Sequence, residues 1–437
     1  MKPSFRFALT ALALSFGPAL VAAAPPASNV SDSFAITNVR VFDGSTVIPG
    51  ATVVVRNGRI DAVGPNVLPP ADLPAVDGTG STLLPGMIDA HAHARTRQEL
   101  ERALQFGVTT EMDMWTLPHF AASMRREQER NGAPYRADQF SAINPATTPE
   151  GYPYNFTPRR RETPTLSTPE EAEGFVADLV AIGANHLKLM LEDGSTGGFA
   201  VPILSRPTVQ ALTQAIHSRG KLAVAHVTEQ VHATNAIEDG VDGLEHIFVD
   251  EIAHPDFVQL AVSRGIFVVG TLNAEEAFIT TAGGESIIAD PDLAPYLTDE
   301  EIESLLTPGP PSPLTLENLE IAKQNVRILH EAGVPILAGT DVYTHGISIH
   351  RDLELLVQAG LEPIDALVAA TSAPAAAFGF TDRGRIAPGL RADLVLVQGD
   401  PTANIKATRK IRRIWKIGVE VERELAADRS APLSHGH

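Results

Sequence analysis

The chain of 437 residues contains no cysteine. This absence excludes disulfide bonds, zinc–thiolate sites, iron–sulfur clusters and a cysteine nucleophile, and it rules out lipid attachment at a cysteine. Basic residues are also few compared with acidic ones, 34 Lys and Arg against 53 Asp and Glu, so the formal net charge is −19. A surface this acidic argues against nucleic acid or an anionic membrane as a partner.

Long apolar runs are missing after the N-terminus, where no stretch approaches the roughly 20 apolar residues that a membrane span needs. At the N-terminus itself, Lys2 and Arg6 precede an apolar run from Phe7 to Ala24 that a Gly-Pro pair interrupts. The run is short, contains a helix breaker and ends in small residues that suit cleavage. This pattern predicts a signal peptide over residues 1–24 rather than a membrane anchor, and therefore a periplasmic or secreted protein.

Short β-patterns lie at both ends of the remaining chain. Near the N-terminus, alternating and β-branched segments flank the dipeptide Asn57-Gly58, a strong signal for a two-residue hairpin turn. Further β-rich segments lie between residues 393 and 417. We therefore predict one small β-sandwich domain that is assembled from residues 33–85 and 386–425.

The middle of the chain alternates short apolar runs with longer amphipathic runs. The expected strands are Gly86–His93, Val108–Met114, Gln139–Asn144, His186–Leu191, Leu222–His226, Gly243–His246, Ile266–Thr271 and Ile336–Asp341. Helical patterns fit between most of them, at Pro169–Ile182, Arg206–Arg219, His232–Asp239, Thr315–Ala332 and His350–Ala359. Such alternation is typical of a (β/α)₈ TIM-type barrel or a doubly wound sheet. Because no Gly-rich dinucleotide fingerprint follows the first strand, we predict an α/β fold with a (β/α)₈ barrel over residues 86–385.

Two segments rich in Pro, Gly and polar residues interrupt this alternation, at residues 145–169 and 273–313. Each follows an expected strand. Loops of that length usually cover or line a functional site, although a surface excursion without function is the alternative.

Polar residues that can bind a metal stand at the ends of several expected strands. His91 and His93 are two positions apart, so their imidazoles point to the same face of the strand and can reach one metal ion. His226, His246 and Asp341 each close an apolar strand, at the end where barrel enzymes hold their catalytic residues. Each of them alone is more commonly a satisfied polar group of the core, but the whole set is hard to explain as packing.

A lysine, Lys188, lies inside the apolar run Leu187–Met190. A buried lysine has a lowered pKa, so its neutral amine can take up carbon dioxide to form a carbamate that bridges two cations. The alternative is a lysine at a strand end whose side chain reaches water.

Such a set of imidazoles and carboxylates suits borderline divalent ions such as zinc. Two ions roughly 3.5–4 Å apart can share a bridging hydroxide, because metals lower the pKa of bound water to near 7. Asp341 would orient this hydroxide, accept its proton and deliver the proton to the leaving group.

These residues resemble the amidohydrolase superfamily, and within it the imidazolonepropionase-like and prolidase-like branch. The motifs that carry the resemblance are Pro85-Gly86-Met87-Ile88-Asp89-Ala90-His91-Ala92-His93, Leu187-Lys188, His226, Glu245-His246, Gly339-Thr340-Asp341, Ala370–Ala375 and Gly384–Leu394. The resemblance implies a metal-bearing barrel with a small β-sandwich. It also implies the ligand roles: a first metal held by His91 and His93, a second held by His226 and His246, carbamylated Lys188 as the bridge, and Asp341 as first-metal ligand and proton shuttle.

Members of that branch commonly hydrolyse amide bonds next to a carboxylate, as in dipeptides and N-acyl amino acids. This chain departs from their pattern in two places. The residues after the lysine are Leu191-Glu192-Asp193-Gly194 instead of Ser-Gly-Gly. The residues after the fifth-strand histidine, Val227–His232, do not follow the basic or aromatic pattern found in many members.

The sequence therefore predicts an exported, binuclear hydrolase of an amide or peptide bond in a small molecule or short peptide. Tyr343 and His345, which closely follow Asp341, and Trp115, just beyond the second strand, are the candidate substrate contacts. The same metal centre could instead cleave a lactone or ester, and a metal-binding protein without turnover is the alternative from another class. Association of copies of the chain into a homo-oligomer is left open.

Overall fold

The structure, a computed structural model, describes residues 32–154, 163–309, 312–342 and 344–426, which lie within one unit, Ser31–His437. The expected signal peptide and Tyr343 lie outside the described residues. Within the described part of the chain, no helix is long and apolar enough to cross a membrane.

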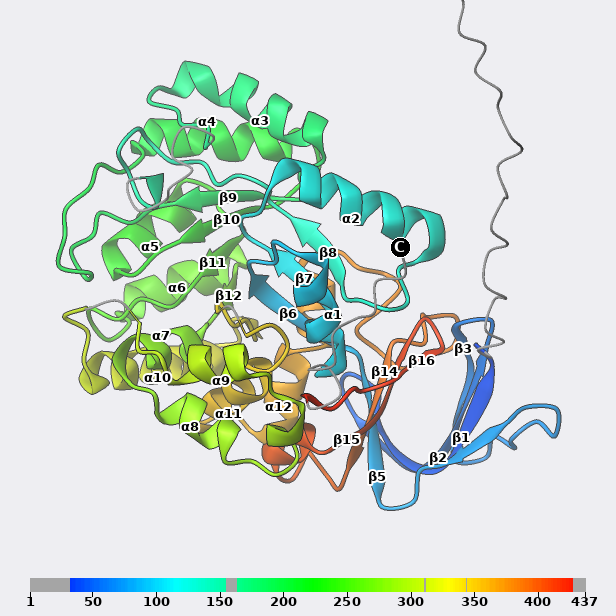
Figure 1. Ribbon diagram of the computed structural model, residues 1–437. Helices are drawn as coiled ribbons and strands as arrows, with labels where there is room; N and C mark the ends of the chain where they lie inside the picture. Colours follow the sequence, from blue (N-terminus) through cyan, green and yellow to red (C-terminus); the bar gives the residue numbers. More distant parts are fainter. Residues whose placement is uncertain (1–31, 155–162, 310–311, 343, 427–437) are drawn as a thin grey trace, which may run out of the picture. The chain divides into compact units, whose positions relative to one another are not determined.

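Strands from both ends of the chain share one sheet. Its strands are β1 (Phe34–Phe42), β2 (Val47–Arg56), β3 (Arg59–Gly64), β4 (Ala75–Asp77), β5 (Ser81–Pro85), β14 (Leu394–Gln398), β15 (Ile411–Lys416) and β16 (Val419–Val421). The order is β16-β15-β14-β5-β1-β2-β3, with β4 paired to β1, so the antiparallel pair β5–β14 unites the two ends (Figure 1). The expected hairpin turn is confirmed: Asn57 and Gly58 join β2 to β3 with φ of 50° and 71°.

This sheet curls over its own apolar face. Phe34 of β1 and Trp415 of β15 are separated by two strands, which in a flat sheet would put them about 14 Å apart. Their ring centroids are 5.0 Å apart, and both rings belong to the same buried cluster. The face between them therefore forms a separate small core, while the predicted domain boundaries stay a prediction.

Parallel strands form the second part of the fold. β6 (Met87–Ala92), β7 (Val108–Asp113) and β8 (Asp138–Ser141) make one sheet. β9 (Leu187–Met190), β10 (Ala223–His226), β11 (Gly243–Glu245), β12 (Phe267–Val269) and β13 (Ile336–Leu337) make another, in chain order. Each expected central strand is confirmed, and so is the mixed α/β class with parallel sheets.

Hydrogen bonds connect the edges of these two parallel sheets. Next to β8, Ala146 donates to the carbonyl of Lys188 at 2.7 Å and accepts from the backbone of Met190 at 3.0 Å. Next to β13, the carbonyl of Ala338 accepts from Ala90 of β6 at 2.9 Å. One edge therefore joins β8 to β9, the next strand along the chain, and the other joins the segment after β13, the last of the parallel strands, to β6, the first.

Helices follow most of the parallel strands. They are α1 (Arg97–Gln105), α2 (Pro118–Asn131), α3 (Ala172–Ile182), α4 (Arg206–His217), α5 (Gln230–Glu238), α6 (Pro255–Arg264), α10 (Leu316–Glu331), α11 (Ile349–Ala359), α12 (Pro363–Ala369) and α13 (Ser372–Ala377). Helices α3 to α6 lie outside the strands β9–β12 (Figure 1). The largest apolar cluster packs strand residues such as Leu187 and Leu244 against helix residues such as Leu212 and Val326.

The segment 273–313 is not the loop that the sequence suggested. It contains most of α7 (Leu272–Ile279) together with α8 (Ala282–Ile288) and α9 (Asp299–Leu306). The start of α9 is a capping box in which Thr298 and Glu301 satisfy each other's backbone N–H groups. Thr280 and Thr281 separate α7 from α8, and a segment with Pro291 and Pro295 separates α8 from α9.

Candidate active site

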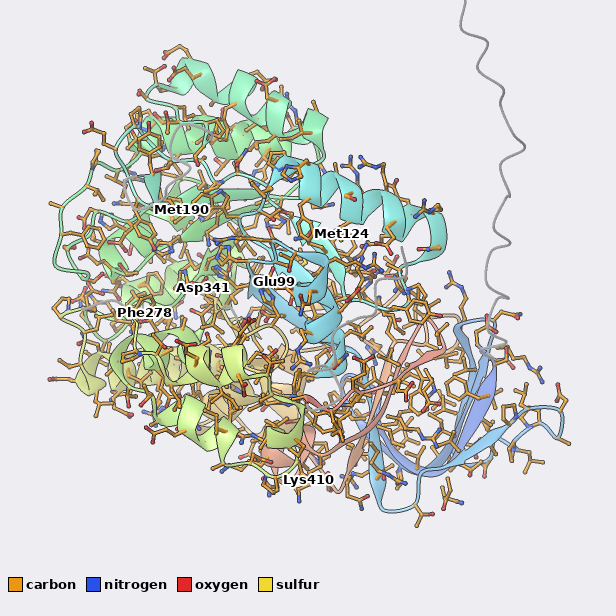
Figure 2. The ribbon with its side chains drawn as sticks, in the orientation of Figure 1. Glu99, Met124, Met190, Phe278, Asp341 and Lys410 are labelled. Carbon is orange, nitrogen blue, oxygen red and sulfur yellow. The ribbon has the colours of Figure 1, made fainter. Side chains whose placement is uncertain are left out.

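Six residues expected to bind metal surround one cavity of about 190 Å³. They are His91, His93, Lys188, His226, His246 and Asp341, and each lies on or just after a parallel strand near its carboxyl end. Parallel strands place these ends together, which explains how residues 250 positions apart in the sequence meet. Figure 2 shows Met190, Phe278 and Asp341, which also line this cavity, in the same region of the molecule.

Asp341 is the centre of this arrangement. Its Oδ1 lies 2.8 Å from Nε2 of His93 and 3.4 Å from Nε2 of His91. Its Oδ2 lies 3.6 Å from Nε2 of His246. The ring centroids of His226 and His246 are 4.4 Å apart, so the fourth imidazole adjoins the same space.

The backbone is unusual at two of these residues. His246 has φ of 78° and Asp341 has φ of 49°, in the left-handed region that non-glycine residues rarely adopt. Such conformations persist where the surrounding structure holds them, and they concentrate at functional sites. Both side chains line the cavity, His246 directly after β11 and Asp341 four residues after β13.

Charges in the cavity are strongly coupled. Burial alone would raise the pKa of Asp341, but the adjacent imidazoles of His91 and His93 hold it well below its usual range. Burial lowers the pKa of His246 well below its ordinary value, and the neighbouring imidazoles lower it further. A carboxylate and imidazoles, each able to bind in its deprotonated form, are the donor set that a divalent cation requires.

Lys188 does not reach water, which excludes the alternative reading of a surface lysine. It is 2% exposed, and its Nζ has no hydrogen-bond partner among the described residues. Burial lowers its pKa to about 8. A buried amine without a partner is costly, so this position calls for a modification or a ligand.

Two residues behind the cavity orient the imidazoles, and the sequence reasoning did not assign them this role. Oε2 of Glu245, a fully buried carboxylate, lies 2.6 Å from Nδ1 of His91. The hydroxyl of Thr271 lies 2.7 Å from Nδ1 of His246. The hydroxyl of Thr271 on Nδ1 leaves Nε2 of His246 as its ligand atom, and the carboxylate beside Nδ1 of His91 favours the same orientation there. An acidic residue at the end of an apolar strand, as at Glu245, was the available signal.

Glycine is required just before Asp341. A Cβ on Gly339 would lie 2.5 Å from Val269 Cγ1 and 2.9 Å from both the backbone nitrogen and the Cβ of His91. The absence of a side chain lets this segment approach β6, where the backbone nitrogen of Asp341 donates to the carbonyl of His91 at 2.9 Å.

Of the expected substrate contacts, the structure describes Trp115 and His345, and it places them differently. Trp115 lines the cavity, and its carbonyl lies 3.4 Å from Nδ1 of His93. His345 instead is buried, with its Nδ1 2.9 Å from Oε1 of Glu111, and it is not among the cavity-lining residues. Burial would lower the pKa of His345, but Glu111 raises it to about 9. Tyr152, which the sequence reasoning did not assign, lines the cavity and lies against His226, with ring centroids 5.2 Å apart.

The described residues fit a divalent metal. One ligand atom each from His91, His93 and Asp341 lie within 4.8 Å of one another, as one ion requires. The unpartnered Lys188 and the imidazoles of His226 and His246 adjoin this group in the same cavity.

A model described as the amidohydrolase family matches residues 82–421. The chain belongs to the amidohydrolase family. Imidazolonepropionase of Cereibacter sphaeroides is 26% identical over 410 residues, which cover 87% of this chain and 95% of the relative. Imidazolonepropionase of Salinispora arenicola is 24% identical over 385 residues, covering 83% of this chain and 89% of the relative.

Among solved structures, a Xaa-Pro dipeptidase with methionine bound in its active site has a TM-score of 0.72 with 20% identity. The match covers 89% of this amidohydrolase and 100% of that chain. The family predicted from the sequence is confirmed, together with its imidazolonepropionase-like and prolidase-like branch. So is the enzyme class, a hydrolase of carbon–nitrogen bonds.

Proposed function

We propose that this amidohydrolase is an exported enzyme that cleaves an amide or peptide bond of a small substrate with a binuclear metal centre. The observation that carries the proposal is the convergence of four imidazoles, one ionised carboxylate and one unpartnered buried lysine on a single cavity. A buried apolar core has no need for this set, and each member would be costly without a ligand.

The assignment of ligands follows from the neighbours of each side chain. His91, His93 and Asp341 would hold one ion, because their donor atoms already face one another. His226 and His246 would hold the second ion, and a carbamate on Lys188 would bridge the two ions. Zinc is the ion that we expect and the one to test first. Bound divalent ions would supply an activated water at neutral pH and would polarise the substrate carbonyl.

Asp341 would move the proton. Its lowered pKa means that the carboxylate is ionised at neutral pH and can accept a proton from the attacking water. Since Asp341 stands at the cavity wall and not behind the imidazoles, it could then donate that proton to the departing nitrogen. Trp115 and Tyr152 would limit the space for the substrate and exclude water from it.

Two features outside the cavity belong to the same proposal. We take the two parallel sheets as one closed (β/α)₈ barrel, which the hydrogen bonds at both edges support. We also take residues 1–24 as a cleaved signal peptide, so that the enzyme acts in the periplasm or outside the cell. Its partner would be a small molecule or short peptide, without nucleic acid or membrane.

The test is hydrolysis by the purified chain lacking residues 1–24, loaded with zinc, across dipeptides, N-acyl amino acids, other amides, lactams, lactones and aryl esters. Asp341→Asn is the control, since it keeps the shape of the side chain. Cleavage of one amide class that the variant loses would support the proposal. Preference for lactones or esters would favour the alternative chemistry, and metal binding without turnover of any member would favour a metal-binding protein.

A further inference from the structure

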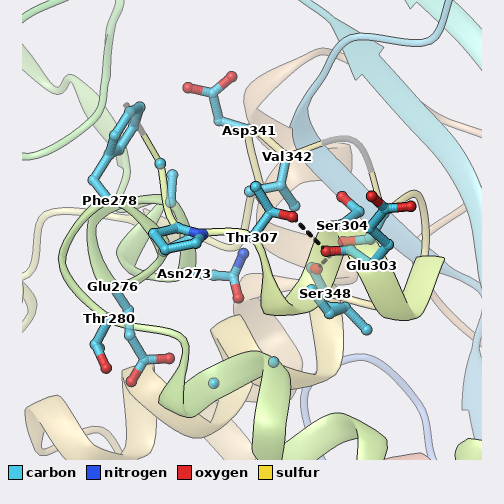
Figure 3. Close-up of a pocket in the computed structure, with 18 of the residues that line it drawn as sticks. Asn273, Glu276, Phe278, Thr280, Glu303, Ser304, Thr307, Asp341, Val342 and Ser348 are labelled. Carbon is cyan, nitrogen blue, oxygen red and sulfur yellow. Dashed lines mark hydrogen bonds between the residues drawn. The ribbon is translucent and has the colours of Figure 1, made fainter. Parts of the chain in front are cut away.

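A second, larger cavity of about 520 Å³ adjoins the first, within the size range of ligand sites. Helices α7, α8 and α9 and the segments after β13 and α9 surround it (Figure 3). Figure 3 shows Asp341 and Phe278 on one side of this cavity and Ser348 and Thr280 on the other. We call this cavity the leaving-group pocket.

The leaving-group pocket and the metal-site cavity share two wall residues, Asp341 and Phe278. The proposed proton donor therefore stands where the two cavities meet. Because a proton must be delivered to the departing nitrogen, that nitrogen lies beside Asp341 when the bond breaks. The rest of the departing amine then extends into the space beyond Asp341, away from the imidazoles.

Part of the wall of the pocket is apolar. Ala274 and Ala277 of α7, Phe278, Leu305 and Pro308 contribute to it, and glycines at 283, 284 and 309 line it where neighbouring segments approach closely. A Cβ on Gly309 would lie 2.7 Å from the ring of Phe278, and one on Gly284 would lie 2.0 Å from the carbonyl oxygen of Leu305. The wall is therefore shaped by backbone and small side chains, which suits an apolar group.

Every charged side chain in the described wall of the pocket is acidic. These are Glu276, Glu300, Glu303 and Asp341. Glu276 accepts two hydrogen bonds from Arg351, of 2.8 and 2.6 Å, and Arg351 also binds Glu354 at 3.1 Å, so this guanidinium already faces two carboxylates. Among the described residues of this wall, a substrate carboxylate would meet negative charge and no lysine or arginine.

We propose that the pocket binds the departing amine of the substrate and that this amine is apolar and carries no carboxylate. The substrates would then be amides of aryl or alkyl amines rather than dipeptides or N-acyl amino acids. This inference rests on the proposed function for the position of the bond, whereas the chemistry of the pocket stands on its own wall.

A single-cysteine experiment tests the pocket without turnover, since the native chain has no cysteine. Ala277→Cys and Ser304→Cys each place one thiol in the pocket wall, and Ser263→Cys places one on the surface of α6 as a control. The two ligands are 4-methylaniline and 4-aminobenzoate, which carry a methyl group and a carboxylate, respectively, at the same ring position. The measurement is the rate at which an aromatic disulfide reagent labels each thiol.

We expect 4-methylaniline to slow labelling of both wall thiols, 4-aminobenzoate to do so about tenfold less effectively, and neither to affect the control. Equal or better protection by the carboxylate, or no protection of either wall thiol, would overturn the inference. The second wall variant gives the same answer if the first does not fold.

Hydrolysis separates this inference from the proposed function. With zinc bound, acetyl-4-methylanilide should have kcat/KM about tenfold or more above 4-acetamidobenzoate, and Ala277→Trp should remove most of this preference by filling the pocket. Turnover with the opposite preference would contradict the inference about the pocket and still support the proposed hydrolase activity. Protection of the thiols without any amide turnover would contradict the proposed hydrolase activity and still support the inference about the pocket.

Discussion

The hydroxyl of Thr340 donates a 2.7 Å hydrogen bond to Oδ2 of Asp89, although 251 residues separate them in the sequence. Oδ1 of the same carboxylate accepts from the backbone nitrogens of Thr340 at 3.0 Å and His91 at 3.1 Å. One buried side chain therefore fixes both segments that carry ligand candidates, His91 on β6 and Asp341 after β13. Residues of this kind set the position of ligands without touching the ion.

Thr340→Val should weaken the site without unfolding the chain. The variant keeps the shape of the side chain but loses the hydroxyl that holds Asp89, so we expect about a 10- to 100-fold loss in metal affinity or kcat/KM. Metal titration by calorimetry and hydrolysis assays measure this. Thr340→Ser, which keeps the hydroxyl, should retain most of both, and an equal loss in the two variants would contradict the role given to the hydrogen bond.

Lys188→Ala should lower the metal content from two ions per chain to one or none. The reason is that the carbamate on Lys188 is the proposed bridge and Nζ has no other partner among the described residues. Metal content after dialysis, measured by plasma emission spectrometry, decides the outcome. Lys410→Ala, at an exposed lysine outside the cavity, should keep both ions. Two ions in Lys188→Ala would show that the bridge comes from elsewhere.

The strands and the metal-ligand candidates could be predicted from local patterns. Apolar runs with turn residues between them gave the central strands, and polar residues at strand ends gave the six residues that converge. Helices α1, α2 and α6 were missed, although Pro118 in the first turn of α2 and Gly132 after its end, with φ of 70°, are ordinary helix boundaries.

The direction of side chains beyond the strands could not be predicted. His345 was chosen because it closely follows Asp341, whose φ is left-handed, while Tyr343 lies outside the described residues and stays a prediction. The side chain of His345 is buried against Glu111. The contact of Glu245 with His91 and the pairing of Asp89 with Thr340 depend on long-range assembly, which no local pattern records.

Asp138→Asn should strongly destabilise the fold. Oδ2 of Asp138 lies 2.8 Å from Nζ of Lys416, 2.7 Å from Nη1 of Arg383 and 2.9 Å from Nη1 of Arg391. The carboxylate is fully buried, and β8 meets the curled sheet here through Lys416 of β15. Neutralising it removes the one carboxylate that all three cations share and leaves only Asp382 and Asp393 beside them, which costs about 3–5 kcal/mol. Unfolding in urea measures the change.

The exposed pair of Asp72 and Arg56, at 3.2 Å, provides the control for this change. Asp72→Asn should leave the free energy of unfolding nearly unchanged, since exposed ion pairs contribute little. If the two variants were equally stable, the buried cluster would not be the connection between β8 and the curled sheet that its geometry indicates.

The stability of the chain should fall in acid partly through His350 of α11. Its Nε2 lies 3.1 Å from the carbonyl of Phe106 and its Nδ1 lies 3.1 Å from the hydroxyl of Thr408, with the ring fully buried. Burial lowers the pKa of His350 to about 3, and Arg409 and Arg423 act in the same direction while Asp290 opposes them. The ring is therefore neutral in the folded state where the unfolded chain would already be protonated.

The sign of the pH effect follows from this difference. Below about pH 6.5 the unfolded state binds a proton that the folded state does not, so folding stability decreases as the pH falls toward 3. By about pH 4.5 this one group removes about 2–3 kcal/mol.

His350→Gln lacks the titration, so its stability deficit relative to the native chain should shrink between about pH 7.5 and about pH 4.5. Urea unfolding across this range measures the deficit, with His254→Gln, at an exposed histidine, as the matched control. A deficit that stays constant with pH would mean that His350 takes up its proton without unfolding.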